Sequence, residues 1–192
     1  IGESAVANKL GDLLSRQSSP LVGTTAGAGL VGVRIRYEGP EEGADDALQS
    51  IDARVARLLG DNVYGRDNDS LASVVLRSLD SRGGILVTVE SCTGGLLGGA
   101  LTRIPGSSSA YLGGWITYAN EMKAGEVGVP QALRDREGAV SEAAARAMAE
   151  GALLSGAGGA AAHALAITGV AGPGGGSDEK PVGLVYIAVA SR

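Results

Sequence analysis

The chain has 192 residues, of which 44% are hydrophobic and 32 are glycine, and its formal net charge is −5. This length suits one large or two small domains with a sizeable core, and an acidic balance without a basic tract argues against a nucleic-acid partner. A single cysteine excludes an internal disulfide framework and suits a cytoplasmic location, and no apolar stretch approaches the roughly 18 residues of a membrane-spanning helix.

The first third of the chain predicts a small α+β domain over residues 1–66. Apolar residues at helical spacing predict a helix over 3–16, and apolar–polar alternation predicts a half-buried strand over 31–37. A second amphipathic helix is expected over 48–58, with Gly60 as its C-terminal cap. This segment holds no cluster of reactive side chains, so we expect it to be a spacer or a dimerisation element.

The remaining residues, 67–192, alternate predicted helices with predicted strands, which indicates an α/β domain. Asn120 and Ser141 can cap helices, and the segment 182–190 is apolar on both faces, which predicts a strand in the interior of a sheet. The expected elements are helix 71–79, strand 85–89, helix 96–104, strand 111–118, a short helix from Asn120, helix 142–155, strand 164–168 and strand 182–190. Because the chain opens within a helix and stops just after a strand, we expect both ends to be truncated.

A turn of small residues between strand 85–89 and helix 96–104 offers three possible nucleophiles, Ser91, Cys92 and Thr93. The turn matches neither Gly-x-Ser-x-Gly nor Ser-x-x-Lys, the two common serine-hydrolase patterns. A Ser or Thr that only caps the helix is the simpler interpretation, whereas free N–H groups at the helix start would also suit a nucleophile or an anion. Cys92 lies in apolar sequence, where a thiol is normally buried and inert.

A catalytic serine needs a base, and the sequence offers two. His163 is the only histidine and lies in an Ala-rich stretch, where a residue near the end of a helix is more typical than a member of a Ser-His-Asp triad. Lys123 can act as a base if burial or a nearby cation lowers its pKa, and the Tyr118 hydroxyl could relay a proton. Taken alone, Lys123 is more typical of a solvated helix surface. One His and one Cys do not make a zinc site, so no metal is expected.

A glycine-rich loop follows the strand 164–168. The run Gly169-Val-Ala-Gly-Pro-Gly-Gly-Gly176 matches neither a P-loop nor a dinucleotide fingerprint. It is either a flexible surface loop or a backbone cradle for a phosphate or carboxylate. Thr168 ends the preceding strand, and α/β sheets bind ligands at the carboxyl ends of their strands, which favours a site.

Six segments of the chain occur together and in order in one known family. They are Glu90-Ser-Cys-Thr-Gly-Gly95, Pro105-Gly-Ser-Ser108, Tyr118-Ala-Asn-Glu-Met-Lys123, Gly138-Ala-Val-Ser-Glu142, Thr168-Gly-Val-Ala-Gly-Pro-Gly-Gly-Gly176 and Glu179-Lys-Pro-Val-Gly183. Over about residues 70–190, the chain resembles the C-terminal domain of the competence/damage-inducible protein (CinA) family, the nicotinamide-nucleotide amidohydrolases. The N-terminal part is similar to this family's middle domain through Gly2-Glu-Ser4, Val31-Gly-Val-Arg-Ile35 and Leu59-Gly-Asp-Asn-Val-Tyr-Gly65.

The resemblance implies a three-layer α/β/α amidohydrolase domain that converts nicotinamide mononucleotide (NMN) and water to nicotinate mononucleotide and ammonia, with no metal or other cofactor. By motif, Ser91 takes the place of the nucleophile that forms an acyl-enzyme, and Tyr118 and Lys123 take the places of the residues that activate it. The substrate-binding positions implied are Thr93, Gly94, Gly95, Thr168, Gly169 and Gly172. We expect a cytoplasmic homodimer with NMN as its small-molecule partner and no nucleic-acid or membrane partner.

One departure from the family concerns the end of the chain. The family usually continues with a Gly-Asp-Arg segment, whose Arg is a substrate ligand, and a final helix, whereas Arg192 lacks the Gly-Asp context. The site is therefore expected to be incomplete in this chain. Two alternatives stay open: a nucleotide-binding or regulatory module without turnover, and an amidohydrolase that acts on another amide.

Overall fold

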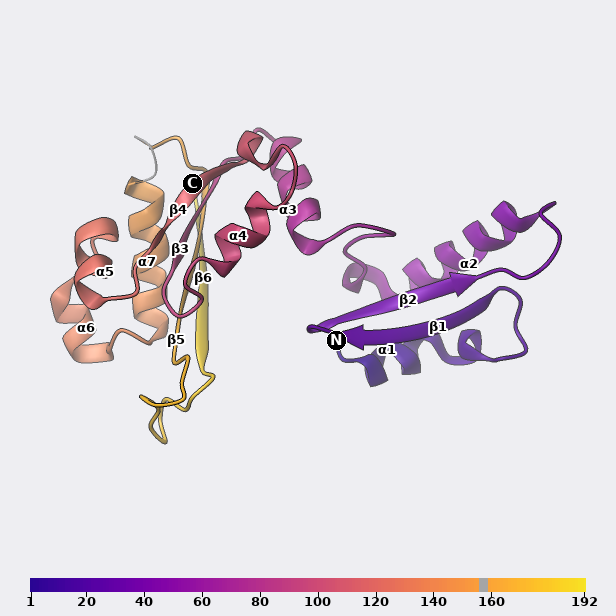
Figure 1. The fold of residues 1–192 in the computed structure, drawn as a ribbon, viewed down its shortest axis with the longest axis horizontal. Coiled ribbons are helices and arrows are strands. Elements are labelled where there is room, and N and C mark those ends of the chain that lie inside the picture. Colours follow the sequence, from indigo (N-terminus) through magenta and orange to yellow (C-terminus); the bar gives the residue numbers. More distant parts are fainter. Residues whose placement is uncertain (156–158) are drawn as a thin grey trace. The chain divides into compact units, whose positions relative to one another are not determined.

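The computed structural model describes residues 1–155 and 159–192, and the chain divides into two compact units, Ile1–Arg66 and Asp67–Arg192 (Figure 1). In the first unit, helices and an antiparallel hairpin share a core of aliphatic side chains from α1, β1 and α2. Its elements are α1 (Glu3–Leu10), a 3-10 turn (Gly11–Leu14), β1 (Leu21–Gly27), β2 (Leu30–Arg36), α2 (Ala44–Leu59) and a 3-10 turn (Gly60–Asn62).

The first unit departs from the sequence pattern at two places. The N-terminal helix ends at Leu10 rather than near residue 16, because Gly11 takes a φ of 51° and donates its N–H to the Ala7 carbonyl. The pattern does not predict β1, since its Gly-Thr-Thr-Ala-Gly stretch lacks apolar alternation. β1 pairs with β2 through Ala28 and Gly29, whose positive φ values of 50° and 77° are those of a two-residue hairpin turn.

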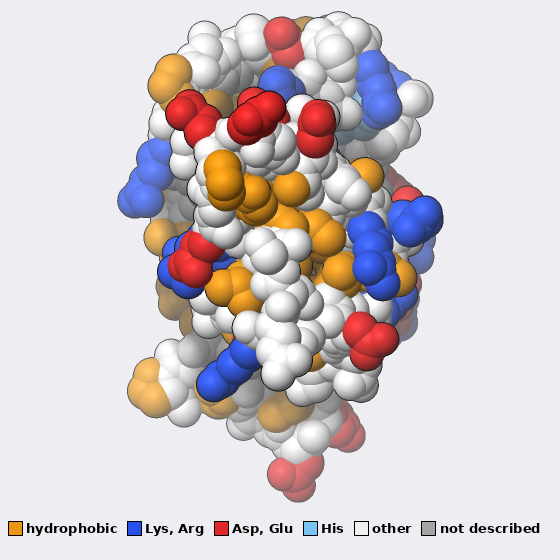
Figure 2. Space-filling view, turned by 90° about the vertical axis from the view of Figure 1, so that its right-hand side faces the viewer, with side chains coloured by type: hydrophobic (Ala, Val, Ile, Leu, Met, Phe, Trp, Pro, Cys, Tyr) orange, Lys and Arg blue, Asp and Glu red, His pale blue; other side chains and the backbone are white. Residues whose placement is uncertain are grey.

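The surface shows no single kind of side chain on the face drawn in Figure 2. Acidic and basic side chains are interspersed there, and exposed hydrophobic side chains lie between them. Within residues 1–155 and 159–192, no helix has both the length and the apolar character needed to cross a membrane.

The second unit is a four-stranded sheet between two layers of helices, which confirms the predicted three-layer α/β/α class. The strand order is β4-β3-β5-β6, with β3 parallel to both β4 and β5, and β5 antiparallel to β6. Its elements are α3 (Leu71–Asp80), β3 (Leu86–Glu90), α4 (Leu96–Thr102), a 3-10 turn (Ser107–Ser109), β4 (Tyr111–Ile116), α5 (Asn120–Val127), α6 (Gln131–Glu137), α7 (Glu142–Ser155), β5 (His163–Gly169) and β6 (Val185–Ser191).

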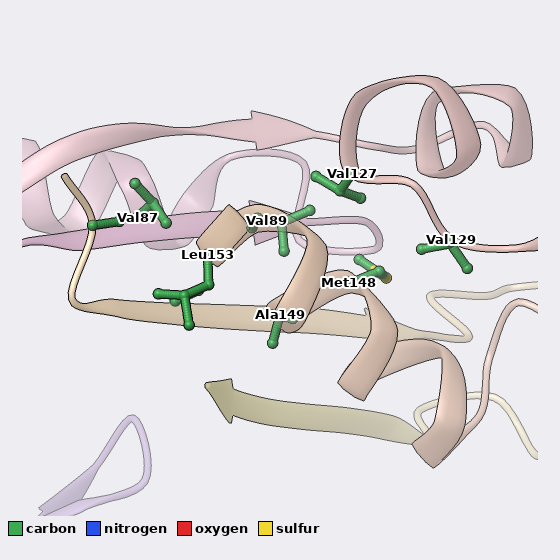
Figure 3. Close-up of a cluster of buried hydrophobic side chains, with 11 residues drawn as sticks. Val87, Val89, Val127, Val129, Met148, Ala149 and Leu153 are labelled. Carbon is green, nitrogen blue, oxygen red and sulfur yellow. The ribbon is translucent and has the colours of Figure 1, made fainter. Parts of the chain in front are cut away.

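Alternate residues of β3 enter two separate cores, one on each face of the sheet. Val87 and Val89 pack with Met148 of α7 (Figure 3), whereas Leu86 packs on the other face with residues of α3 and α4. All residues of β3 are buried, as expected for a central parallel strand. The helix α7 lies close to α5 because Gly151 has no side chain: a Cβ there would stand 1.7 Å from the Val127 carbonyl oxygen.

The prediction that the last strand lies in the sheet interior is wrong. β6 is an edge strand, and its residues Val185, Ile187 and Val189 are 46%, 66% and 68% exposed. The alternate residues Ala188 and Ala190 pack against the core under α7. An apolar sequence on both faces of a strand therefore did not show whether other elements cover one face of that strand or both.

The predicted helix caps have mixed outcomes. Ser141 caps α7 as predicted, since its Oγ accepts the Ala144 N–H at 3.1 Å. Asn120 does not cap α5: Ala119 is the N-cap, and Asn120 is the first helical residue. The helix α6 is not predicted by the pattern, because its Gln-Ala-Leu-Arg-Asp-Arg-Glu sequence has no apolar period.

Candidate active site

The carboxyl ends of β3, β4 and β5 meet at one edge of the sheet. The chain runs from β3 to β4 through α4 on one face and reaches β5 through helices on the other face, so this edge is a topological switch point of the kind that binds ligands in α/β sheets. The Ser91 N–H, just after β3, donates to the Ile167 carbonyl at 2.9 Å, and the Thr117 N–H donates to the Glu90 carbonyl at 2.7 Å. The segments that leave β3 and β4 are thus fixed to neighbouring strands.

Ser91 and Lys123, predicted as nucleophile and base, lie in direct contact. Ser91 is 6% exposed and Lys123 is 2% exposed. The Lys123 Nζ donates to Ser91 Oγ at 3.1 Å, to the Thr117 carbonyl at 2.8 Å and to the Tyr118 carbonyl at 3.2 Å. In the described part of the chain, no carboxylate forms an ion pair with this lysine.

The surroundings of Lys123 favour a neutral amine more than those of a surface lysine do. Burial lowers the pKa of Lys123 below its ordinary value of 10.5, and the charge of Arg134 lowers it further, while Cys92 and Glu121 act in the opposite direction. As an ammonium, the group has three N–H bonds for three oxygens. As an amine, it keeps two N–H bonds for the two carbonyls and turns a lone pair toward the serine hydroxyl. The same geometry therefore accommodates both states of a general base.

Arg134, on α6, is a site residue that the sequence does not reveal. Its Nη1 donates to the Asn120 carbonyl at 3.0 Å, at the start of the helix that carries Lys123. Its Nε is buried and has no partner among the described residues. Because Arg134 sits in a helix without an apolar pattern, nothing in the sequence links it to the lysine.

Tyr118 contributes its backbone rather than its ring to the contact with Lys123. Its side chain is 70% exposed, and its carbonyl oxygen accepts the Nζ hydrogen bond. Within the described residues the hydroxyl forms no hydrogen bond with Ser91 or Lys123, so the proton relay through this hydroxyl stays a prediction.

The turn after Ser91 uses most of its own N–H groups. The Gly94 N–H donates to the Ser91 carbonyl and the Gly95 N–H donates to Glu90 Oε2, both at 3.1 Å, while Thr93 Oγ1 donates to the same carboxylate at 2.6 Å. Among the described residues, the N–H groups of Cys92 and Thr93 have no acceptor. Within the described residues these two N–H groups, unlike those of the glycines, are not used by a hydrogen bond of the turn.

Glu90 is a second residue whose role sequence reasoning missed. It follows the strand predicted over 85–89, but in the structure it is the last residue of β3 and is 2% exposed. The only signal is the spacing of three residues to Thr93, which brings the hydroxyl back to the carboxylate across one turn.

The predicted binding residues of the glycine loop serve packing and loop closure in this structure. Thr168 is fully buried, and its Oγ1 donates to the Ala139 carbonyl at 2.9 Å. A Cβ on Gly169 would stand 2.6 Å from the Leu184 carbonyl oxygen and 3.0 Å from Cys92 Sγ. Gly172, with a φ of 79°, leaves a similar space for Val182. The loop thus closes against β5 next to the turn of Ser91, and its contact with a substrate stays a prediction.

His163 and Arg192 lie at the edge of the sheet formed by the amino end of β5, opposite the carboxyl ends of β3, β4 and β5. His163 is the first residue of β5, not a helix end, and its Nδ1 lies 2.8 Å from Ser191 Oγ. Arg192 donates to the carbonyls of Leu153 and Gly159. Both are therefore remote from Ser91. Within the described ranges, no group of three or more His, Cys, Asp or Glu is placed to hold a metal ion.

Curated relatives match the whole chain. The CinA-like protein of Synechococcus sp. (strain CC9902) is 47% identical over 193 residues, and the putative competence-damage inducible protein of Symbiobacterium thermophilum is 44% identical over 194 residues. Each match covers 100% of this chain and 45% of the relative. The chain thus spans just under half the length of these relatives.

Solved structures match about two thirds of the chain. The competence/damage inducible protein CihA from Agrobacterium tumefaciens aligns with a TM-score of 0.62 and 45% identity, over 68% of this chain and 77% of that one. The competence damage-inducible protein A from Klebsiella pneumoniae gives a TM-score of 0.59 and 38% identity, over 64% and 74%. Residues 68–192 match the family model of the CinA C-terminal domain, and residues 1–65 match that of the damage-inducible protein CinA KH domain. The chain therefore belongs to the CinA family.

Proposed function

We propose that the chain is a nicotinamide-nucleotide amidohydrolase that converts NMN and water to nicotinate mononucleotide and ammonia. The observation that carries the proposal is the 3.1 Å hydrogen bond between Lys123 Nζ and Ser91 Oγ, two buried side chains. This pair supports the hydrolytic chemistry. The choice of NMN rests on the resemblance of the ordered motifs to the family.

Acylation begins when the neutral Lys123 amine accepts the proton of the Ser91 hydroxyl. The Ser91 oxygen attacks the carboxamide carbon, and the carbonyl oxygen becomes a tetrahedral oxyanion. The free N–H groups of Cys92 and Thr93 stabilise this oxyanion, an effect worth about 3 kcal/mol per donor in related chemistry. The C–N bond then breaks, and Lys123 returns its proton to the leaving nitrogen, which departs as ammonia.

Deacylation repeats these steps with water. Lys123 accepts a proton from a water molecule, whose oxygen attacks the acyl carbon, and the bond to the Ser91 oxygen breaks. The serine recovers its proton from the lysine, and the product is a carboxylic acid that releases its own proton to solvent and leaves as a carboxylate. In each half of the cycle, the buried lysine accepts one proton and returns it. It can therefore serve as the general base and the general acid of both steps without a metal ion or a histidine.

Recognition of the substrate phosphate must be local, because a net charge of −5 offers no long-range attraction to an anion. The glycine loop from Gly169 to Gly172 is the proposed contact. The same net charge, and the interspersed charges on the face in Figure 2, argue against a nucleic-acid partner. A cytoplasmic homodimer remains part of the proposal.

The test is ammonia release by the purified protein supplied with NMN, with nicotinate mononucleotide measured by chromatography. We expect Ser91→Ala to lower the rate by about 1,000-fold or more, and Cys92→Ala to retain it. Unchanged release in Ser91→Ala contradicts the mechanism, and inactivation by Cys92→Ala alone moves the nucleophile to Cys92.

Two further outcomes address the alternatives. NMN that stays bound and intact for hours, with no ammonia released, indicates a binding module without turnover. Ammonia release from other pyridine nucleotides or simple amides, but not from NMN, indicates a hydrolase of another amide.

A further inference from the structure

We infer that Glu90 is a positioning residue, whose buried carboxylate holds the turn that carries Ser91 in the geometry needed for attack. The inference deepens the proposed function and rests on it, because Glu90 acts only through Ser91. Glu90 is the last residue of β3 and directly precedes the proposed nucleophile.

The carboxylate accepts four hydrogen bonds from the turn and from the start of α4. Oε2 accepts from Thr93 Oγ1 at 2.6 Å, from the Gly95 N–H at 3.1 Å and from the Leu97 N–H at 3.0 Å, and Oε1 accepts from the Gly98 N–H at 2.8 Å. One side chain thus ties residues 93–98 to the end of the central strand. The free N–H groups of Cys92 and Thr93 lie within the segment that this anchor closes.

The arrangement requires a carboxylate, because all four partners are donors. A glutamine would turn an NH₂ group toward some of them and leave partly buried donors without their acceptor. Because the Glu90 side chain is 2% exposed, water cannot enter its position and replace the lost acceptor. Burial by itself raises the pKa of Glu90, but its hydrogen bonds outweigh this effect and hold the pKa below the ordinary 4.5, so the group is charged at neutral pH.

The Glu90 carboxylate forms hydrogen bonds with the turn and none with Lys123. In the part of the chain that the structure describes, the Glu90 carboxylate accepts hydrogen bonds only from the turn and α4, and Lys123 forms no ion pair with a carboxylate. An ion pair between the two would favour the protonated lysine and oppose its action as a base. The structure therefore places a carboxylate beside Ser91 in sequence without pairing it with Lys123.

The start of α4 is closely packed at Gly98, one of the donors to Glu90. A Cβ on Gly98 would stand 2.8 Å from the Tyr111 hydroxyl and 3.5 Å from Glu90 Oε1, and the Tyr111 hydroxyl is itself 2.7 Å from Thr88 Oγ1. Misplacement of a reacting group by about 1 Å can cost about 100-fold in rate. A turn that loses its anchor should therefore react slowly even when the domain stays folded.

The experiment compares Glu90→Gln with Glu150→Gln, which removes an exposed carboxylate from α7 and keeps the same change in net charge. We measure kcat and KM for NMN per folded molecule, well below the unfolding temperature. Glu90→Gln should lower kcat by about 10- to 100-fold and leave KM within about threefold, and Glu150→Gln should change neither. Thr93→Val, which removes one of the four hydrogen bonds, should lower kcat by a smaller factor.

A second readout does not depend on NMN: the rate at which a fluorophosphonate labels Ser91, followed by mass spectrometry. Folded Glu90→Gln should be labelled more slowly than the wild type, and Glu150→Gln at the wild-type rate. If Glu90→Gln does not fold, Thr93→Val decides by the same two measurements.

The outcomes separate the inference from the proposed function. Equal kcat and equal labelling in wild type and Glu90→Gln overturn the inference while the proposed function stands. A rise in KM at unchanged kcat also overturns it, because it would indicate a substrate contact. A wild type that is labelled but releases no ammonia overturns the proposed function, and the labelling rates then decide the inference alone. A wild type that is neither labelled nor active overturns both.

Discussion

The two edges of the central sheet carry similar side chains in opposite environments. At the carboxyl edge, Ser91 and Lys123 are buried and bonded to each other. At the amino edge, His163 and Ser191 form an exposed pair of comparable length. The difference teaches that residue type does not mark the reactive edge. Burial of a lysine without a carboxylate partner distinguishes the proposed reactive edge, because burial lowers the pKa of Lys123.

The largest effect should come from removing the base at the carboxyl edge. We expect Lys123→Ala to lower NMN deamidation by about 1,000-fold or more. Lys123→Arg should be equally inactive, because a guanidinium keeps the charge but cannot be deprotonated in a protein. Initial rates of ammonia release, with circular dichroism to verify folding, test both. Substantial activity in folded Lys123→Arg would exclude proton transfer by this residue.

A smaller effect should come from the neighbouring cation, Arg134. The base acts in its neutral form, so activity rises with pH as Lys123 loses its proton. Arg134 lowers the pKa of Lys123, and removing that positive charge raises it again. In Arg134→Gln the acidic limb of the kcat/KM profile should therefore move to higher pH, and the largest loss of rate should fall on that limb.

Arg134→Lys is the matched control, because it keeps a positive charge at this position. The acidic limb of the kcat/KM profile of Arg134→Lys should lie closer to the wild-type limb than the limb of Arg134→Gln does. A shift of the limb to lower pH in Arg134→Gln, or no shift, would show that Arg134 does not set the protonation of the base.

At the end of β5, Thr168 should matter for stability. Thr168→Val removes the buried hydroxyl that donates to the partly buried Ala139 carbonyl at 2.9 Å, and the loss of such a hydrogen bond costs about 0.5–1.5 kcal/mol. The urea midpoint of the second unit should fall accordingly, whereas Thr168→Ser, which keeps the hydroxyl, should fall less. Equal losses in the two variants would assign the effect to the methyl group.

The smallest effect belongs to the amino edge. His163→Ala removes a half-buried side chain whose exposed partner, Ser191, can bond to water instead. We expect kcat and KM for NMN to change by less than about twofold, and stability by less than about 0.5 kcal/mol. A loss of activity comparable to that of Lys123→Ala would abolish the distinction between the two edges.

Local signals in the sequence predicted much of the fold and part of the site. Helical spacing and apolar runs located α2, α3, β3 and β5, and Gly60 and Ser141 acted as the predicted caps. β1 and α6 escaped prediction because neither has an apolar period. The position of β6 as an edge strand was not predicted from the sequence. Whether a face of the sheet is covered depends on which helices pack against it, and this is a property of the whole domain.

The sequence by itself determined the residue types that amide hydrolysis needs, their order, and the α/β layers that hold them. It favoured Ser91 with Lys123, but only through resemblance, since 32 residues separate them and a lone lysine is usually solvated. The tertiary structure alone decided that this lysine is buried, that Arg134 lies near it, and that the carboxylate of Glu90 binds the turn instead of the base. The reason is physical: contact, burial and the pKa of a side chain depend on neighbours brought together from distant segments, and such neighbours leave no period in the chain.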